Sequence, residues 1–308
     1  SDTYRVYIGE AENIYERLLT HLKEKDFWHE QNGVYFVDDV ELLEDNEKKF
    51  RNLDLTYAVR DGIISHCGEL DENSIRPREN WFDLKGFDKK GKFQAATWEG
   101  CVVKLADKIA YLGRDIEDAI RLNYLSAKDK EFLQDMARVH NESAINTTVI
   151  MHNMIIDLCN SSSPETGLTL SKEMSKQLNE IKRFNETKIY NNPRLNTFKK
   201  YSELVLNEIF VILLEYYDKH GQDVIGWLSS NKFDGKDFVE GFCKWIVAYC
   251  DLDFSEMQWA EKIAQNCLNK KIYSDLSDRK KYIQAIIDYM AGMTDVYALN
   301  AFEELLKC

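Results

Sequence analysis

The sequence is poor in the residues that interrupt regular structure. Its 308 residues include only 3 prolines and 14 glycines, too few for an all-β fold with many turns or for a low-complexity chain. The longest uninterrupted apolar runs, Ile209–Leu214 and Trp245–Cys250, are far shorter than the roughly 20 residues that a membrane-spanning helix needs. No apolar segment follows the first residues, so no signal peptide is visible. We therefore expect a cytoplasmic protein that does not enter a membrane.

Positive charge, paired cysteines and common catalytic motifs are also scarce. The chain has 40 Lys and Arg against 53 Asp and Glu, a net charge of −13, which does not favour nucleic acid as the main partner. Its 7 cysteines are odd in number and lack C-x-x-C spacing, as in a protein with reduced thiols. The sequence contains no phosphate-binding glycine loop and no nucleophile elbow. These absences leave the sequence without an obvious catalytic centre.

Helical periodicity runs through nearly the whole sequence and predicts an all-α fold without a strong domain boundary. The pattern leaves two segments open. Tyr35–Leu43 fits either a short strand or the start of a helix. Between Glu69 and Thr97 the periodicity is lost, which is compatible with a mobile surface insertion or with a lid. The expected helices from there onward are Trp98–Leu122, Ala127–His140, Ala144–Cys159, Lys172–Tyr190, Phe198–Lys219, Lys236–Cys250, Phe254–Asn269 and Asp278–Leu306.

The predicted helix Trp98–Leu122 carries the most informative pattern. At about 100° per residue, one broad arc is apolar and the opposite face is polar. Asp107, Tyr111 and Asp115 are four residues apart, so they form a single stripe on the polar face. Such a stripe could bind a metal, stack a sugar or base and accept hydrogen bonds, or it could be an ordinary solvated face. The apolar arc comprises Leu105, Ala106, Ile109, Leu112, Ile116 and Ile120, and the polar face comprises Lys104, Asp107, Lys108, Tyr111, Asp115 and Asp118.

Four segments in the same order resemble motifs of one enzyme family. They are residues 53–68 (LDLTYAVRDGIISHCG), 99–120 (EGCVVKLADKIAYLGRDIEDAI), 175–190 and 287–298 (IDYMAGMTDVYA). Together they are similar to the dGTPase-like branch of the HD-superfamily deoxynucleoside triphosphate triphosphohydrolases. The resemblance implies an HD-domain-like multi-helix architecture with a C-terminal helical extension. Residues 51–160 would then be part of the catalytic core, residues 161–308 the C-terminal region, and residues 1–50 remain unassigned.

The resemblance also implies a reaction and a site. In the family, a His…His-Asp…Asp cluster binds a divalent metal such as Mg or Mn, and a deoxynucleoside triphosphate is hydrolysed to the deoxynucleoside and triphosphate. The matching motif places Asp107 as a metal ligand. It places Tyr111 against the deoxyribose and Asp115 at its 3′-hydroxyl. Deoxynucleoside triphosphates are therefore the expected partners, and other catalytic residues stay unassigned.

The sequence departs from the family pattern at the metal cluster. It contains no His-Asp dipeptide, and Arg114 stands where the family commonly has histidine. One aspartate cannot hold a catalytic metal, because these ions need several protein ligands. The chain is thus expected to be inactive alone, either as a portion of a longer enzyme or as a non-catalytic module that binds nucleotides or partner subunits. Family members are commonly oligomers, so a homo-oligomer or a missing N-terminal portion should cover the apolar helices Ala144–Cys159 and Phe198–Tyr217.

Overall fold

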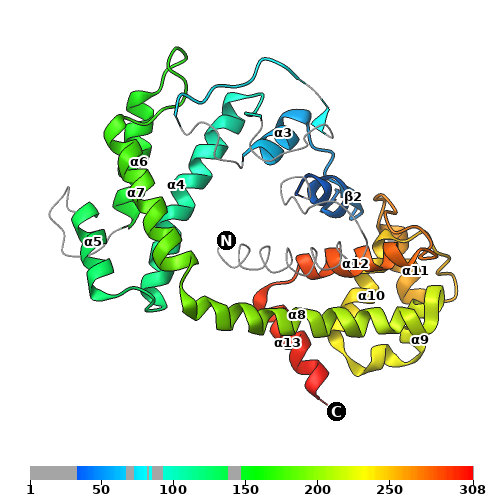
Figure 1. The fold of residues 1–308 in the computed structure, drawn as a ribbon. Coiled ribbons are helices and arrows are strands. Elements are labelled where there is room, and N and C mark those ends of the chain that lie inside the picture. The colour runs from blue at the N-terminus through cyan, green and yellow to red at the C-terminus, as the bar shows by residue number, and fades with distance from the viewer. Residues whose placement is uncertain (1–32, 67–72, 82, 85–92, 138–146, 308) are drawn as a thin grey trace. The chain divides into compact units, whose positions relative to one another are not determined.

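The computed structural model describes residues 33–66, 73–81, 83–84, 93–137 and 147–307, and over these residues the all-α prediction is confirmed (Figure 1). A two-stranded antiparallel sheet, β1 (Leu42–Glu44) with β2 (Phe50–Asn52), is the only sheet in these ranges. No helix in them is long and apolar enough to cross a membrane. The helices are η1 (Phe36–Val40), α3 (Tyr57–Ser65), α4 (Trp98–Arg121), α5 (Ala127–Ala137), α6 (Thr147–Ser161), α7 (Lys172–Phe184), η4 (Asn185–Tyr190), α8 (Pro193–His220), η5 (Gly221–Asp223), α9 (Val224–Ser230), η6 (Lys232–Gly235), α10 (Asp237–Tyr249), α11 (Gln258–Asn266), α12 (Arg279–Ala291) and α13 (Asp295–Leu306).

The chain forms two compact units. One is continuous, Thr56–Phe198, and the other combines Ser1–Leu55 with Lys199–Cys308. In the continuous unit α4 is the central helix, and α3, α6, α7 and η4 all pack against it (Figure 1). Its core contains Ile109, Leu112 and Ile116 of α4. The predicted regions 1–50, 51–160 and 161–308 follow from matches to family motifs, whereas the two units are defined by their compactness. The predicted regions therefore stay a prediction.

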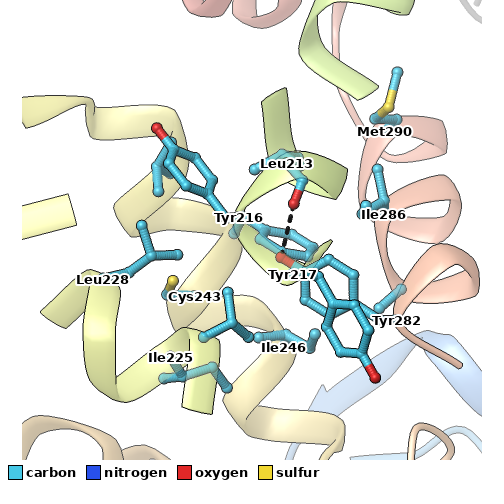
Figure 2. Packing of buried hydrophobic residues seen from close by; sticks show 14 of the residues in the cluster. Leu213, Tyr216, Tyr217, Ile225, Leu228, Cys243, Ile246, Tyr282, Ile286 and Met290 are labelled. Carbon is cyan, nitrogen blue, oxygen red and sulfur yellow. Dashed lines mark hydrogen bonds between the residues drawn. The ribbon is translucent and has the colours of Figure 1, made fainter. Parts of the chain in front are cut away.

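The core of the discontinuous unit lies among α8, α10 and α12 (Figure 2). Tyr217 and Tyr282 stack with their ring centroids 4.5 Å apart. The Tyr282 hydroxyl donates a hydrogen bond of 3.0 Å to the Leu213 carbonyl oxygen, and both groups are buried (Figure 2). Buried tyrosines keep their apolar rings in the core only when the hydroxyl finds an acceptor, and this carbonyl supplies one.

The segment of residues 33–52 packs against the C-terminal helices of this unit. The sequence of Tyr35–Leu43 is compatible with either a short strand or the start of a helix. The structure contains both there, because η1 ends at Val40 and β1 begins at Leu42. These distant parts of the chain are joined by specific polar contacts. They include hydrogen bonds from Tyr35 Oη to Asp288 Oδ2 (2.7 Å), from Tyr249 Oη to the Val40 carbonyl oxygen (2.6 Å) and from Leu268 N to the Phe50 carbonyl oxygen (2.8 Å), and an ion pair between Lys270 Nζ and Asp39 Oδ1 (2.5 Å).

Two predicted helices are divided in the structure. The run predicted at Lys172–Tyr190 is α-helical to Phe184 and continues as the π-helix η4. The run predicted at Asp278–Leu306 is broken between α12 and α13, where the Thr294 hydroxyl accepts a hydrogen bond from Tyr297 N and caps α13. The short helix α9 has no counterpart in the prediction. Parts of the helices predicted at 127–140 and 144–159 lie outside the described residues.

Some of the described residues in the segment 69–97 are packed, whereas its role as a surface insertion or a lid stays a prediction. Ile75 pairs with Leu168 through two backbone hydrogen bonds of 2.8 and 2.9 Å. Ile75, Leu84 and Ala95 are buried. The periodicity is lost here because the segment is held by side chains and isolated bridges and not by a helix of its own. Residues 69–72, 82 and 85–92 lie outside the described residues.

Candidate functional site

Helix α4 carries the candidate site and begins at a well-defined cap. The Thr97 side chain accepts a hydrogen bond of 3.1 Å from Gly100 N, which satisfies one of the free amides at the helix start. From there α4 continues without interruption for 24 residues, as predicted. Four members of the predicted apolar arc are buried: Leu105, Ile109, Leu112 and Ile116. The arc thus fixes the rotation of the helix and the direction of the polar stripe.

The three predicted site residues lie on this helix with partly buried side chains. Tyr111 packs against the core of the continuous unit. The Asp115 carboxylate accepts a hydrogen bond from the hydroxyl of Tyr190 at the end of η4. Asp107 lies one turn before Tyr111 on the same face. The structure therefore brings Tyr190 to Asp115, a partnership that the sequence did not predict although Tyr190 ends one of the family-like segments.

The polar face of α4 is not an ordinary solvated face. Lys104 and Lys108 keep only 1% and 6% of their surface exposed, although both were expected opposite the apolar arc. Lys104 Nζ donates a hydrogen bond of 3.1 Å to Gln94 Oε1. Ala106, expected in the apolar arc, is exposed. The alternative of a solvated face does not hold for these two lysines, and for Lys104 the segment preceding α4 supplies a polar partner.

The middle of α4 is packed closely against its neighbours. A Cβ atom on Gly113 would lie 2.7 Å from the Met151 sulfur, so the glycine allows α6 to approach. On another side, Asn185 of the π-helix η4 is fully buried and its Nδ2 donates to the Leu112 carbonyl oxygen at 3.1 Å. The extra residue per turn in a π-helix shifts the side chains that follow it, and such turns are frequent at functional sites. This packing fixes η4, and with it Tyr190, beside α4.

A buried ion pair fixes the start of α4 relative to α3. Asp61 of α3 is fully buried, and its Oδ2 accepts a hydrogen bond of 2.6 Å from Ala96 N, just before the helix. Its Oδ1 accepts a hydrogen bond from the Arg78 guanidinium, which also donates to the Tyr57 hydroxyl at 2.9 Å. These contacts tie α3, the segment around Arg78 and the first turn of α4 together. They position the stripe from its N-terminal end.

The described residues do not fit the divalent metal that the resemblance implies. In the described ranges, no group of three or more His, Cys, Asp or Glu side chains is arranged to hold a metal ion. Asp107 offers one carboxylate, which is fewer than the three or four protein ligands of zinc sites and is at the lower limit of what Mg²⁺ sites use. The stripe on α4 can therefore contribute to such a site but does not form one by itself.

Comparison with known proteins gives a consistent set of relatives. No family model matches the chain. It is 24% identical over 295 residues to a deoxyguanosinetriphosphate triphosphohydrolase-like protein of Clostridium perfringens (strain SM101 / Type A), covering 95% of this chain and 64% of that protein. It is 23% identical over 292 residues to the protein of that name from Clostridium tetani (strain Massachusetts / E88), covering 94% and 62%.

A third relative with the same name, from Desulfatibacillum aliphaticivorans, is 29% identical over 208 residues, covering 66% of this chain and 50% of that protein. The chain thus spans less than two thirds of the length of the curated relatives it matches. The similarity nevertheless extends over nearly all of its own residues. The chain is thus similar, at 23–24% identity over nearly its whole length, to proteins named deoxyguanosinetriphosphate triphosphohydrolase-like.

Proposed function

We propose that this chain forms the deoxyribose-binding wall of a deoxynucleoside triphosphate triphosphohydrolase. The observation that carries the proposal is the contact between Asp115 of α4 and the Tyr190 hydroxyl of η4. It holds a partly buried carboxylate in a fixed position on the stripe that also contains Asp107 and Tyr111. The names of the relatives support this substrate class.

The side chains on the stripe have complementary roles in this proposal. The Asp115 carboxylate, oriented by the hydrogen bond from Tyr190, accepts a hydrogen bond from the sugar 3′-hydroxyl. The Tyr111 ring packs against the apolar face of the deoxyribose. Asp107 supplies a single oxygen ligand toward the divalent metal expected for the family. The hydrolytic step itself requires groups beyond these described residues.

Binding of deoxyguanosine to the purified chain tests the wall directly by isothermal titration calorimetry. We expect Asp115→Asn to weaken binding about 10-fold or more, since a charge-assisted hydrogen bond contributes roughly 1.5–3 kcal/mol. Asp118→Asn is the matched control on the same helix, because Asp118 pairs with Arg121 at the surface. 2′,3′-Dideoxyguanosine lacks the 3′-hydroxyl, so it should bind wild type and Asp115→Asn equally weakly. Equal losses in the two variants would contradict the assignment of Asp115.

Hydrolysis is a separate test. We expect no release of triphosphate from dGTP by this chain, because Asp107 alone is an insufficient metal ligand. Release that disappears in Asp107→Ala would show this expectation wrong. Nucleotide binding without hydrolysis is also what the alternative, a non-catalytic module, predicts. An in-frame His…His-Asp segment encoded upstream of Ser1 distinguishes the two, since it would supply the remaining ligands of an enzyme.

A further inference from the structure

The discontinuous unit contains a pocket that is unrelated to the stripe on α4. Its volume is about 670 Å³, which is within the range of small-molecule sites in proteins. The segment 36–42, helix α10 and the junction of α12 with α13 form its walls. Five aromatic residues contribute to the lining: Phe36, Trp245, Tyr249, Tyr289 and Tyr297.

Asp288 is the buried polar group of this pocket. It is only 2% exposed. Its Oδ2 accepts hydrogen bonds from Tyr35 (2.7 Å) and Tyr273 (2.8 Å), and its Oδ1 accepts one from Gln284 Nε2 (2.7 Å). Among the residues that the structure describes, every hydrogen-bond donor to this carboxylate is therefore neutral. Burial raises the pKa of Asp288 to about 6, so the group is mostly ionised at neutral pH.

A buried carboxylate without a bonded cation is an unusual arrangement, because the transfer of an unpaired charge from water costs several kcal/mol. Within the described residues Oδ1 accepts one hydrogen bond, whereas a carboxylate oxygen can accept two. A further donor at Oδ1, especially a positively charged one, would both complete its hydrogen bonding and balance the charge. The pocket beside Asp288 is where such a donor can enter.

We propose that this pocket binds a small organic ammonium ion, which donates a hydrogen bond to Asp288 Oδ1 while its alkyl group packs among the aromatic side chains. Aromatic rings attract cations in addition to packing against methylene groups. Glu41 adds a second carboxylate to the lining. The positive charge of Lys244, also at the pocket, is paired with Glu240 at 2.5 Å. An anionic ligand would instead face the two carboxylates.

The charge requirement is tested with three probes of similar size: n-pentylammonium, 1-pentanol and pentanoate. Binding to the full chain is measured by calorimetry near neutral pH at constant ionic strength. We expect the ammonium ion alone to bind, with at least a 10-fold loss in Asp288→Asn. Asp253→Asn is the control for net charge, because Asp253 is exposed and its carboxylate accepts a hydrogen bond from Ser255 N nearby. Equal binding of the alcohol, preference for pentanoate, no binding, or equal losses in both variants would overturn the proposal.

A second variant keeps the test valid if Asp288→Asn does not fold. Gly292 lines the pocket, has a right-handed conformation, and a Cβ placed on it would make only ordinary contacts of 3.6 Å or more. Gly292→Met should fold and fill part of the pocket, so that pentylammonium binding falls at least 10-fold. Gly226→Met is the control, because a Cβ at Gly226 has no atom within 4 Å. Unchanged binding in Gly292→Met would contradict the location of the site.

The pH dependence gives a third, independent readout. The groups around Asp288 are the hydroxyls of Tyr35 and Tyr273, the Glu41 carboxylate and the ammonium groups of Lys244 and Lys281. Burial raises the pKa of Asp288 itself to about 6. The ammonium ion should therefore bind more tightly as the pH rises through 6, and the dependence should be absent in Asp288→Asn. The same pH dependence in that variant would overturn the role of Asp288.

Discussion

Asp61 fixes the backbone just before α4. Its carboxylate is fully buried and is shared between the Arg78 guanidinium and the Ala96 amide. Removal of one member of a buried ion pair leaves the other charge without compensation, which typically costs 3–5 kcal/mol. We expect Asp61→Ala to lower the free energy of unfolding by about 3 kcal/mol or more, measured by urea denaturation.

The control for this prediction is an exposed ion pair. Lys219 Nζ lies 3.0 Å from Glu215 Oε2 on the surface of α8. Exposed ion pairs of this kind contribute roughly 0–1 kcal/mol to the free energy of unfolding. Glu215→Ala should therefore leave the unfolding free energy nearly unchanged. If Asp61→Ala were as mild as Glu215→Ala, the buried pair would not stabilise the start of α4.

Sequence reasoning succeeded for residues whose neighbours are local and failed for distant ones. Asp107, Tyr111 and Asp115 share a face because the helical repeat fixes their directions, although their roles stay predictions. The burial of Lys104 could not be predicted, since it depends on Gln94 in a segment without periodicity. The contact between Tyr35 and Asp288 joins residues 253 positions apart. No local pattern reveals such a contact.

At the scale of elements, α4 illustrates why a helix begins where it does. Thr97 is extended and its side chain accepts from Gly100 N. We expect Thr97→Ala to destabilise the protein by about 1 kcal/mol through loss of the cap, whereas Thr97→Ser should stay near wild type. Thermal unfolding of the two variants checks this. A Thr97→Ser variant as unstable as Thr97→Ala would indicate that the methyl group, not the cap, is what matters.

Most helices could be predicted because they are long and amphipathic, but their ends and irregular turns could not. The break at 292–294 separates α12 from α13 inside a run that the apolar pattern treats as continuous. Its local signals are Gly292 after one helix and the Thr294 cap before the next. The π-helix η4 gives no such signal, because it results from tertiary packing of residues such as Asn185. The apolar pattern continues through it.

For the molecule as a whole, the raised pKa of Asp288 should make one contribution to folding stability decrease as the pH rises. Its pKa is raised from 3.8 to about 6 by burial, so the folded state binds a proton more tightly than the unfolded state. Its contribution therefore makes the protein less stable as the pH rises from about 4 to about 6, with no further change above. By the linkage relation the effect is roughly 3 kcal/mol. Urea denaturation of wild type and Asp288→Asn across this range checks it, because the difference in unfolding free energy between the two proteins should change by about this amount.

Self-association is the other property of the whole molecule that can be tested. Large apolar side chains remain exposed on α6 and α8, namely Ile155, Ile156, Tyr201, Leu204 and Val211. Exposed apolar patches larger than a few hundred Å² commonly mark interaction surfaces. We expect a dimer or larger species in light scattering at micromolar concentration. A uniform 36.1 kDa species would contradict this expectation.

The contacts of residues 33–52 with the C-terminal helices also have a consequence for biosynthesis. Tyr35 leaves the ribosome 253 residues before its acceptor Asp288 exists, a delay of roughly 10–50 s at about 5–20 residues per second. The continuous unit Thr56–Phe198 has all its own residues within that interval. It can therefore fold while the chain is still being made, whereas residues 33–52 reach their native partners only near the end of translation. The part of the described chain that is synthesised first is among the last to become structured.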